Sequence, residues 1–165
     1  MSAAVPEIEE RVAQPYMAIR ASVAMTGLPG LGARFGEVFG WLGAHGLAPA
    51  GPPFFKYNII DMARELEVDV GVPVAVAADG DGHIIAGVLP AGRYATLLYL
   101  GHPSGLIAAN GALLDWAAGQ GIKWDMSPGE GGELWGSRLE IYLTDPAQEP
   151  DMAKWQTLLA FRVAG

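Results

Sequence analysis

Apolar and polar residues alternate along two stretches of the chain, which predicts two half-buried β-strands. Residues 66–76 place Leu or Val at every second position, and residues 139–144 place Leu or Ile at every second position. Because successive side chains of a strand point to opposite faces, each pattern gives one aliphatic and one polar face. The polar face of the second strand carries Glu140 beside Tyr142, and Asp145-Pro146 ends that strand.

The spacing of other apolar residues predicts two amphipathic helices. The first is read from a stripe formed by Leu31, Phe35, Val38, Phe39 and Leu42. It follows a predicted turn at residues 27–30 and ends near Gly43 and Gly46. The second helix begins after Ser104, whose hydroxyl is the expected N-cap.

The ends of the two helices repeat one another, which indicates a duplicated fold. Residues 41–47 (WLGAHGL) align with residues 116–122 (WAAGQGI) at an offset of 75. After each helix comes a loop and a strand, which ends at Asp61 in the first copy and at Asp145 in the second. Further strands are expected at residues 16–23, 54–60, 84–88, 93–100 and 158–163.

Strand, helix, strand and strand therefore follow one another twice. This order predicts an α+β fold in which an antiparallel sheet carries its helices on one side. Residues 1–13 are expected to be a mobile lead-in, and residues 14–165 one domain with halves at about 14–80 and 83–165. Two halves related by a pseudo-two-fold axis would leave a groove between them, where ligands commonly bind.

Composition excludes several classes of protein. A chain of 165 residues that is 51% hydrophobic can bury a large core. Its formal charge of −8 disfavours binding to nucleic acid, which needs clustered Lys and Arg. The chain has no secretion signal and no apolar run long enough to cross a membrane, so a cytoplasmic protein is expected.

No motif in the sequence predicts a metal ion or another cofactor. There is no cysteine, and His45, His83 and His102 are too far apart for the usual ligand spacing. The glycine-rich residues 30–36 miss the dinucleotide pattern, because the third glycine comes one place late. Residues 79–82 (DGDG) resemble the start of a calcium loop, but Pro90 stands where its bidentate acid is required.

Glu140 is the strongest candidate for a functional residue. A solvated outer face would be the ordinary place for such an acid, because Glu is rarely buried without a partner. However, Trp135 lies just before it and Trp155 just after it, and Tyr57 is expected on a strand of the other half. Aromatic faces attract cations by about 0.5–2 kcal/mol each. Glu140 is therefore predicted to be the negative pole of an aromatic pocket for lipophilic cations.

Several short motifs resemble the GyrI-like effector-binding domain family of bacterial transcription activators. They are residues 53–57 (PFFKY), 65–74 (ELEVDVGVPV), 89–94 (LPAGRY), 140–146 (EIYLTDP) and 155–157 (WQT). The resemblance implies two tandem modules around a central groove, with Glu140 as the acidic anchor of hydrophobic cations. It also implies ligand contacts from residues on both halves, namely Tyr57, Tyr142, Trp155, Phe35, Phe39 and Asn110. Trp135, just upstream of Glu140, is a further candidate.

The resemblance leaves three functions open. The chain has no helix-turn-helix segment, so it is similar to a free-standing member that senses or sequesters small molecules. Some members of the family are hydrolases that open the cyclopropane ring of DNA-alkylating natural products, in which Glu140 would activate water. Others protect DNA gyrase, which would make this chain a protein-interaction module.

Overall fold

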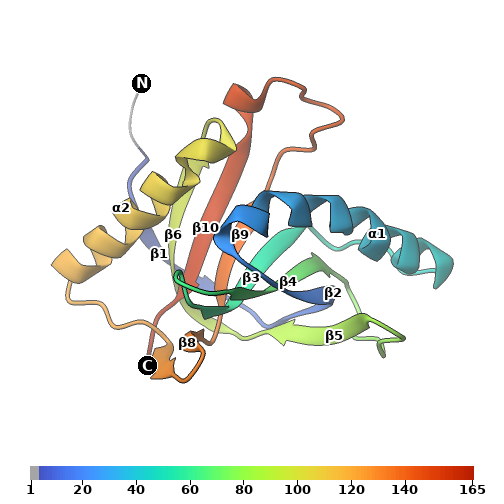
Figure 1. Ribbon diagram of the computed structural model, residues 1–165, viewed down its shortest axis with the longest axis horizontal. Helices are drawn as coiled ribbons and strands as arrows, with labels where there is room; N and C mark the ends of the chain where they lie inside the picture. Colours follow the sequence, from blue (N-terminus) through green and yellow to red (C-terminus); the bar gives the residue numbers. More distant parts are fainter. Residues whose placement is uncertain (1–3) are drawn as a thin grey trace.

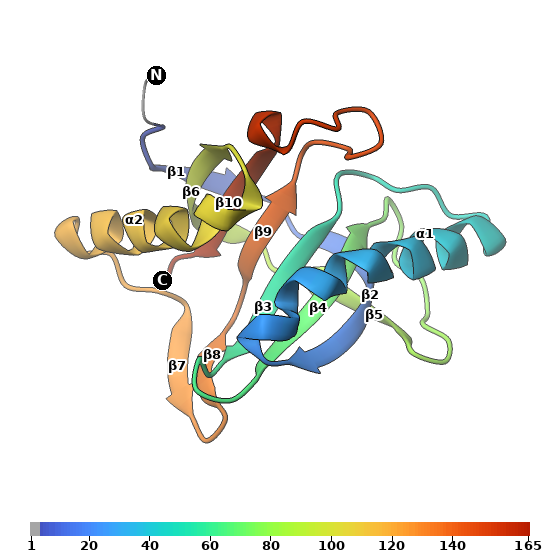
Figure 2. The same ribbon diagram turned by 45° about the horizontal axis from the view of Figure 1, so that its top comes forward.

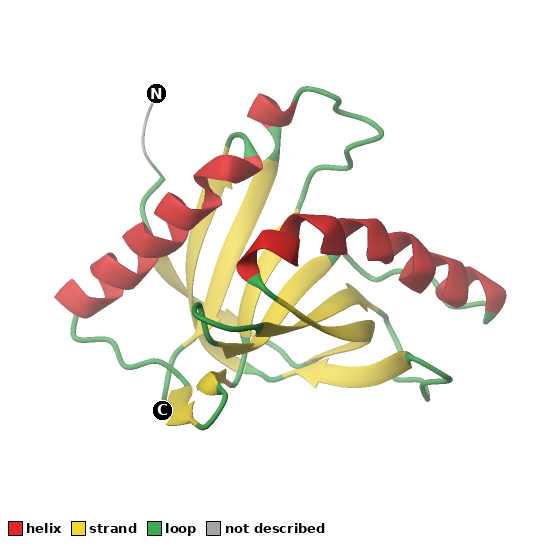
Figure 3. Cartoon of the chain, viewed as in Figure 1, coloured by secondary structure: helices red, strands yellow, loops and turns green. Residues whose placement is uncertain are grey.

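Two α-helices pack on one side of a curled antiparallel sheet in the computed structural model, which describes residues 4–165 (Figures 1 and 3). Across the sheet the strands follow the order β1-β6-β10-β9-β3-β4-β2-β5, and β8 pairs with both β3 and β7. The predicted α+β fold is confirmed. The residues of these elements are β1 (Glu7–Arg11), β2 (Gln14–Val23), α1 (Phe35–Ala44), β3 (Phe54–Ile60), β4 (Leu66–Pro73), β5 (Ile84–Leu89), β6 (Gly92–Leu100), α2 (Leu106–Gly119), β7 (Met126–Gly129), β8 (Gly132–Trp135), β9 (Arg138–Tyr142) and β10 (Gln156–Arg162).

The two halves meet at the centre of the sheet, where β3 pairs with β9. The first half consists of β2, α1, β3 and β4, and the second of β6, α2, β9 and β10. Helix α1 lies over β2 and β4, whereas α2 lies over β6, so β3 and β9 run between the helices (Figure 2). The outermost strands are exchanged, because β1 pairs with β6 and β5 pairs with β2.

The ladder registers identify equivalent residues in the two halves. They superimpose β2 on β6 and β3 on β9, so that Tyr57 corresponds to Tyr142 and Phe55 to Glu140. Phe55 and Glu140 are also direct partners across the ladder, so the pseudo-two-fold axis passes through this pair. Aligning the strands at their terminal aspartates equates Lys56 with Glu140 instead, which is wrong because Lys56 lies on the opposite face of the sheet.

Both helices end in the same way. Gly46 and Gly121 each have φ of 69°, in the left-handed region where glycine is favoured. The next residue in each case, Leu47 or Ile122, donates its backbone N–H back into the last turn. These paired hydrogen bonds satisfy carbonyl groups at the helix end. The repeat predicted from the sequence therefore corresponds to a repeated helix terminus.

The starts of the helices differ from expectation. The predicted turn at residues 27–30 lies inside a 3-10 helix, Met25–Arg34, that leads directly into α1. Ser104 does not cap α2, which begins at Leu106 without a side-chain cap. Instead, His102 accepts a hydrogen bond from the Ser104 N–H (3.0 Å) and caps a short 3-10 turn before the helix.

Three features of the sheet also differ from expectation. Residues 7–11 of the expected mobile lead-in form β1 and pair with β6. Strand β4 is shorter than residues 66–76 and is buried on both faces rather than one. The β7–β8 hairpin follows α2 without having been predicted, because its short strands lack a clear alternation.

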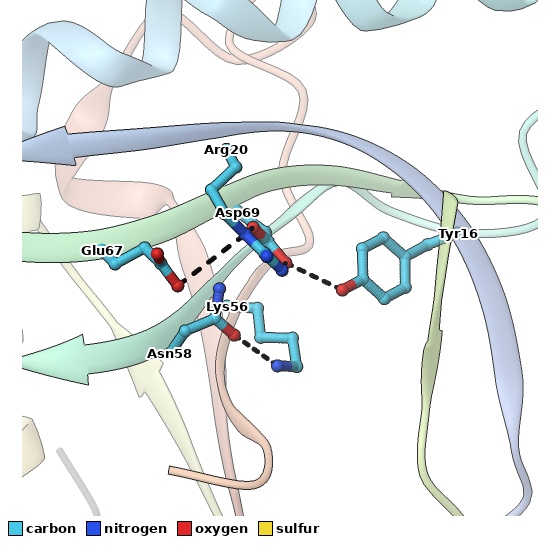
Figure 4. Close-up of polar contacts among 6 residues, drawn as sticks. All are labelled: Tyr16, Arg20, Lys56, Asn58, Glu67 and Asp69. Atoms are coloured by element: carbon cyan, nitrogen blue, oxygen red, sulfur yellow. Dashed lines mark hydrogen bonds and ion pairs between the residues drawn. The ribbon is translucent and has the colours of Figure 1, made fainter. Parts of the chain in front are cut away.

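A polar cluster on the sheet face opposite the helices explains how β4 can be buried on both sides (Figure 4). Asp69 is completely buried and accepts hydrogen bonds from the Tyr16 hydroxyl (2.8 Å) and from Arg20 Nε (2.8 Å). Beside it, Lys56 donates to the side-chain oxygen of Asn58. Buried polar groups are stable when they are paired in this way, so Asp69 is tolerated within an apolar sheet.

Candidate functional site

The carboxylate of Glu140 is held by three neutral donors. Its side chain points to the helix-covered face of β9 and is only 6% exposed. Oε1 accepts from the hydroxyls of Tyr57 (2.9 Å) and Tyr142 (2.8 Å), and Oε2 accepts from Asn110 Nδ2 (3.2 Å). Hydrogen bonds of this kind to an ionised acceptor are stronger than those between neutral groups. The three donors therefore fix the orientation of the Glu140 carboxylate.

Each donor is placed by the duplicated fold. Tyr57 and Tyr142 occupy equivalent positions on β3 and β9, one on either side of the pseudo-two-fold axis. Asn110 lies on α2, where its Nδ2 also donates to the carbonyl of Leu106 (2.8 Å). The helix repeat makes Phe35 the counterpart of Asn110 on α1. One half thus presents polar side chains at the positions where the other presents phenyl rings.

Both tyrosines remain hydroxyl donors because their pKa values lie well above the usual value. Burial is the main cause for Tyr57 and for Tyr142, and the negative charge of Glu140 raises each pKa further. Deprotonation of either phenol would place a second negative charge beside the carboxylate.

Arg138 approaches the carboxylate indirectly. Its Nη2 donates to Asn110 Oδ1 (3.1 Å), and its guanidinium carbon lies 4.6 Å from the ring centroid of Trp135 and 4.4 Å from that of Phe161. Burial lowers the pKa of this guanidinium, although the nearby carboxylates of Glu133 and, to a smaller extent, Glu140 oppose the shift. Its Nε is buried without a hydrogen-bond partner.

An aromatic surface extends from the carboxylate toward α1. Phe35 stacks on Phe55 with ring centroids 5.4 Å apart, and Tyr142 meets Phe55 edge-on at 5.3 Å. Phe35 and Tyr142 are also in edge contact, at 6.0 Å. Phe55 is buried, whereas Phe35 and Tyr142 are partly exposed. These two partly exposed rings are the part of the cluster that a molecule from solvent can reach.

The structure brings together five of the eight predicted site residues, namely Glu140, Tyr57, Tyr142, Asn110 and Phe35. Trp135 is separated from the carboxylate by Arg138 and Asn110.

Trp155 precedes β10 and donates its indole N–H to the carbonyl of Glu149 (2.7 Å), while Phe39 is 37% exposed on α1. No aromatic pair in the described part of the chain joins either ring to the cluster.

Phe55 and Arg138 were not predicted as site residues. Strand alternation could have identified both, because each is two residues from a predicted site residue on the same strand.

Two surface hollows lie elsewhere. One of about 420 Å³ is lined by Trp124, Trp135 and the β7–β8 hairpin, and one of about 130 Å³ lies beside Tyr16 and β5. Glu140 lines neither; it is buried beneath Tyr57, Tyr142 and Asn110, which hydrogen-bond to it. Within residues 4–165, no cluster of three metal-ligating side chains is found, and no helix has the length and apolar character needed to span a membrane.

Comparisons with known proteins give a consistent picture. A model of the GyrI-like small molecule binding domain matches residues 4–164. Among solved structures, the chain is similar to the EcmrR C-terminal domain, at TM-score 0.80 and 20% identity over 98% of both chains. The same domain within an EcmrR–DNA complex matches at TM-score 0.78 and 20% identity over 98% of this chain, which spans 57% of that longer protein.

More distant likenesses are confined to the fold. SAV2435 bound to tetraphenylphosphonium has TM-score 0.66 and 9% identity, over 98% of this chain and 94% of that one. A hydrolase from Listeria innocua has TM-score 0.62 and 11% identity, over 96% of this chain and 91% of that one. The comparison with curated proteins returned no match.

Proposed function

The chain belongs to the family of GyrI-like small-molecule-binding domains, and from this premise we propose that it binds lipophilic, aromatic cations beside Glu140. The aromatic cluster of Phe35, Phe55, Tyr57 and Tyr142 supplies the apolar surface, and Glu140 supplies the counter-charge. The function is sensing or sequestration, since binding requires only burial, stacking and one charge.

The observation that carries this proposal is a buried carboxylate with no direct ion-pair partner. Within residues 4–165, no Lys, Arg or His nitrogen forms an ion pair with Glu140, although its side chain is only 6% exposed. Burying a charge is costly unless it is paired as well as hydrogen-bonded. A cation placed against the carboxylate would restore that balance.

Two further points support a lipophilic cation as the ligand. The rings beside Glu140 would contact such a molecule through both dispersion and cation–π attraction. SAV2435, which shares the fold, was solved with tetraphenylphosphonium, a cation made almost entirely of aromatic surface.

Access to the carboxylate requires side chains to move. Phe35 and Tyr142 are partly exposed and cover the approach from the α1 side. Their rotation would open a path between β9 and α1 without breaking the β-ladder. Side-chain rotations of this size are common when proteins bind ligands.

The direct test is binding of tetraphenylphosphonium, followed by calorimetry or tryptophan fluorescence. Tetraphenylborate has nearly the same shape and the opposite charge, so it serves as the matched probe. We expect the phosphonium to bind and the borate not to bind. Replacing Glu140 by Gln keeps the shape of the side chain but removes its charge, and should weaken phosphonium binding by about ten-fold or more.

Glu65→Gln is the matched control, because Glu65 is exposed and its removal changes the net charge by the same amount. Affinity close to that of the unmodified protein is expected for this variant. Equal weakening by both substitutions would reduce the effect to overall charge and contradict a specific role for Glu140.

Hydrolysis at the same carboxylate is a second candidate, because one protein of this fold is a hydrolase. In that case Glu140 would activate a water molecule for attack on a bound electrophile such as a strained ring. Product formed in excess over the protein present, and lost in Glu140→Gln, would establish catalysis. Binding without product would support the sensing function.

A further inference from the structure

A buried cation lies close to the Glu140 carboxylate without touching it. Arg138 precedes Glu140 by two residues on β9, so both side chains point to the helix-covered face. Asn110 bridges them, since its Oδ1 accepts from Arg138 (3.1 Å) and its Nδ2 donates to Glu140 (3.2 Å). The two charges are therefore connected through a single amide group.

The position of the Arg138 guanidinium is strongly constrained. It lies over the rings of Trp135 and Phe161, at 4.6 and 4.4 Å from their centroids, where these two rings meet edge-on. Phe161 is fully buried and Trp135 is 6% exposed. In the described part of the chain, no carboxylate forms a direct ion pair with Arg138. Glu133, an exposed acid that accepts from the Trp135 indole (3.2 Å), is also near the guanidinium, but Glu140 is the buried acid that hydrogen bonds connect to it through Asn110.

We propose that Arg138 is the internal counter-charge of the Glu140 site, and that it sets the charge selectivity of that site. The class of ligand consequently includes neutral aromatic molecules as well as monocations. This inference rests on the function proposed above and specifies its range of ligands.

The physical reason is the charge balance of the closed site. If Glu140 were the sole charge, a neutral molecule that excluded water would leave the carboxylate unbalanced, and only cations would bind well. With Arg138 connected to it through Asn110, the charge of Glu140 is partly offset, so a neutral molecule that excludes water is tolerated. A monocation still gains from Glu140 but is repelled by Arg138, so its advantage over a neutral molecule is reduced.

The arrangement also determines which side of the carboxylate is open to a ligand. On the α2 side, Arg138 already covers the rings of Trp135 and Phe161. On the α1 side, Phe35 and Phe55 stack on each other, and no Lys or Arg of the described residues makes a cation–π contact with either ring. The aromatic body of a ligand therefore lies toward α1.

The experiment compares methyltriphenylphosphonium with triphenylmethanol, a neutral molecule of similar size, by equilibrium dialysis. Both should bind the unmodified protein, with affinities within about ten-fold of each other. Arg138→Met keeps an apolar stem but removes the charge, and should increase the preference for the phosphonium by about ten-fold. Arg138→Lys keeps the charge and should retain the original preference. A purely structural role would weaken both ligands together and leave their ratio unchanged, which would overturn the inference.

A second variant tests the same idea without replacing Arg138. In Glu140→Gln the guanidinium becomes the sole buried charge of the site, so binding of tetraphenylborate should appear. Failure of the borate to bind this variant would overturn the role of Arg138. If the unmodified protein does not bind the phosphonium, or Glu140→Gln binds it as well as before, the proposed function itself fails. Phosphonium binding that depends on Glu140, with an unchanged ratio in Arg138→Met, overturns the selectivity inference alone.

Discussion

At the scale of single residues, the site depends on phenols that stay protonated. Tyr57 and Tyr142 both donate to Oε1 of Glu140, and burial together with that negative charge raises their pKa values. In the unfolded chain the same phenols titrate near the ordinary value of about 10. Above that pH, the folded state therefore holds protons that the unfolded state has released.

Stability should decline as the pH rises above about 10. The contribution of each phenol to the free energy of unfolding is fully present below the pKa that the phenol has in the unfolded chain. Above that pKa, each phenol that stays protonated in the folded state lowers the free energy of unfolding by about 1.4 kcal/mol per pH unit. Urea denaturation between pH 9 and 11 measures this slope. Tyr142→Phe removes one such group and should give a shallower decline. Parallel slopes in the two proteins would contradict the role assigned to this phenol.

Only part of the site could be predicted at this scale. Tyr142 follows Glu140 by two residues on one strand, so their shared face was visible in the alternation. Tyr57 lies 83 positions from Glu140, and its contact became an expectation through the duplication and the family resemblance. The Arg138–Asn110–Glu140 chain depends on rotamers and on the helix position, which periodicity does not specify.

At the scale of elements, α1 is a helix with weak intrinsic propensity. Three of its ten residues are glycine, and a Cβ added at Gly36, Gly40 or Gly43 would meet no atom within 4 Å. Its stability therefore comes mainly from burial of Val38 and Leu42 against the sheet. The sequence stripe identified these buried positions, but Phe39 of the same stripe lies at the surface.

Substitution of the helix glycines should have opposite effects at neighbouring positions. Gly43→Ala lies within α1 and should raise the free energy of unfolding by about 0.5–1 kcal/mol. Gly46→Ala changes a residue with φ of 69° and should lower it by about 1–2 kcal/mol. Chemical denaturation of the two variants measures both signs. A decrease in the free energy of unfolding for Gly43→Ala as large as that for Gly46→Ala would contradict the different roles assigned to these two glycines.

At the scale of the whole molecule, each half completes the sheet of the other. β1 precedes the first half but pairs with β6 of the second, and β5 precedes the second half but pairs with β2 of the first. The duplicated order of elements and the single-sided placement of the helices were predicted and are confirmed. The exchange of the outer strands was not predicted. Short strands at the junctions of the chain show little alternation of apolar and polar residues, and their partners are distant in sequence.

Removal of residues 1–12 should therefore destabilise the second half. Without β1, the edge of β6 would be open to another chain, so self-association is expected together with a lower melting temperature. For a chain of this length, each kcal/mol lost lowers the melting temperature by about 2–4 °C. Removal of residues 1–5 leaves β1 intact and is the control. Light scattering and thermal denaturation that do not distinguish the two deletions would contradict this view.

The pseudo-two-fold axis through Phe55 and Glu140 has one more consequence. In a dimer of identical halves, such an axis would place the same side chain on both sides, either two acids that repel or two phenyl rings without charge. Because both halves lie in one chain, they can carry different residues at this position, so the centre has a charged end at Glu140 and an uncharged end at Phe55. A molecule bound there as proposed would take one orientation, with its charged group toward Glu140, rather than two equivalent ones.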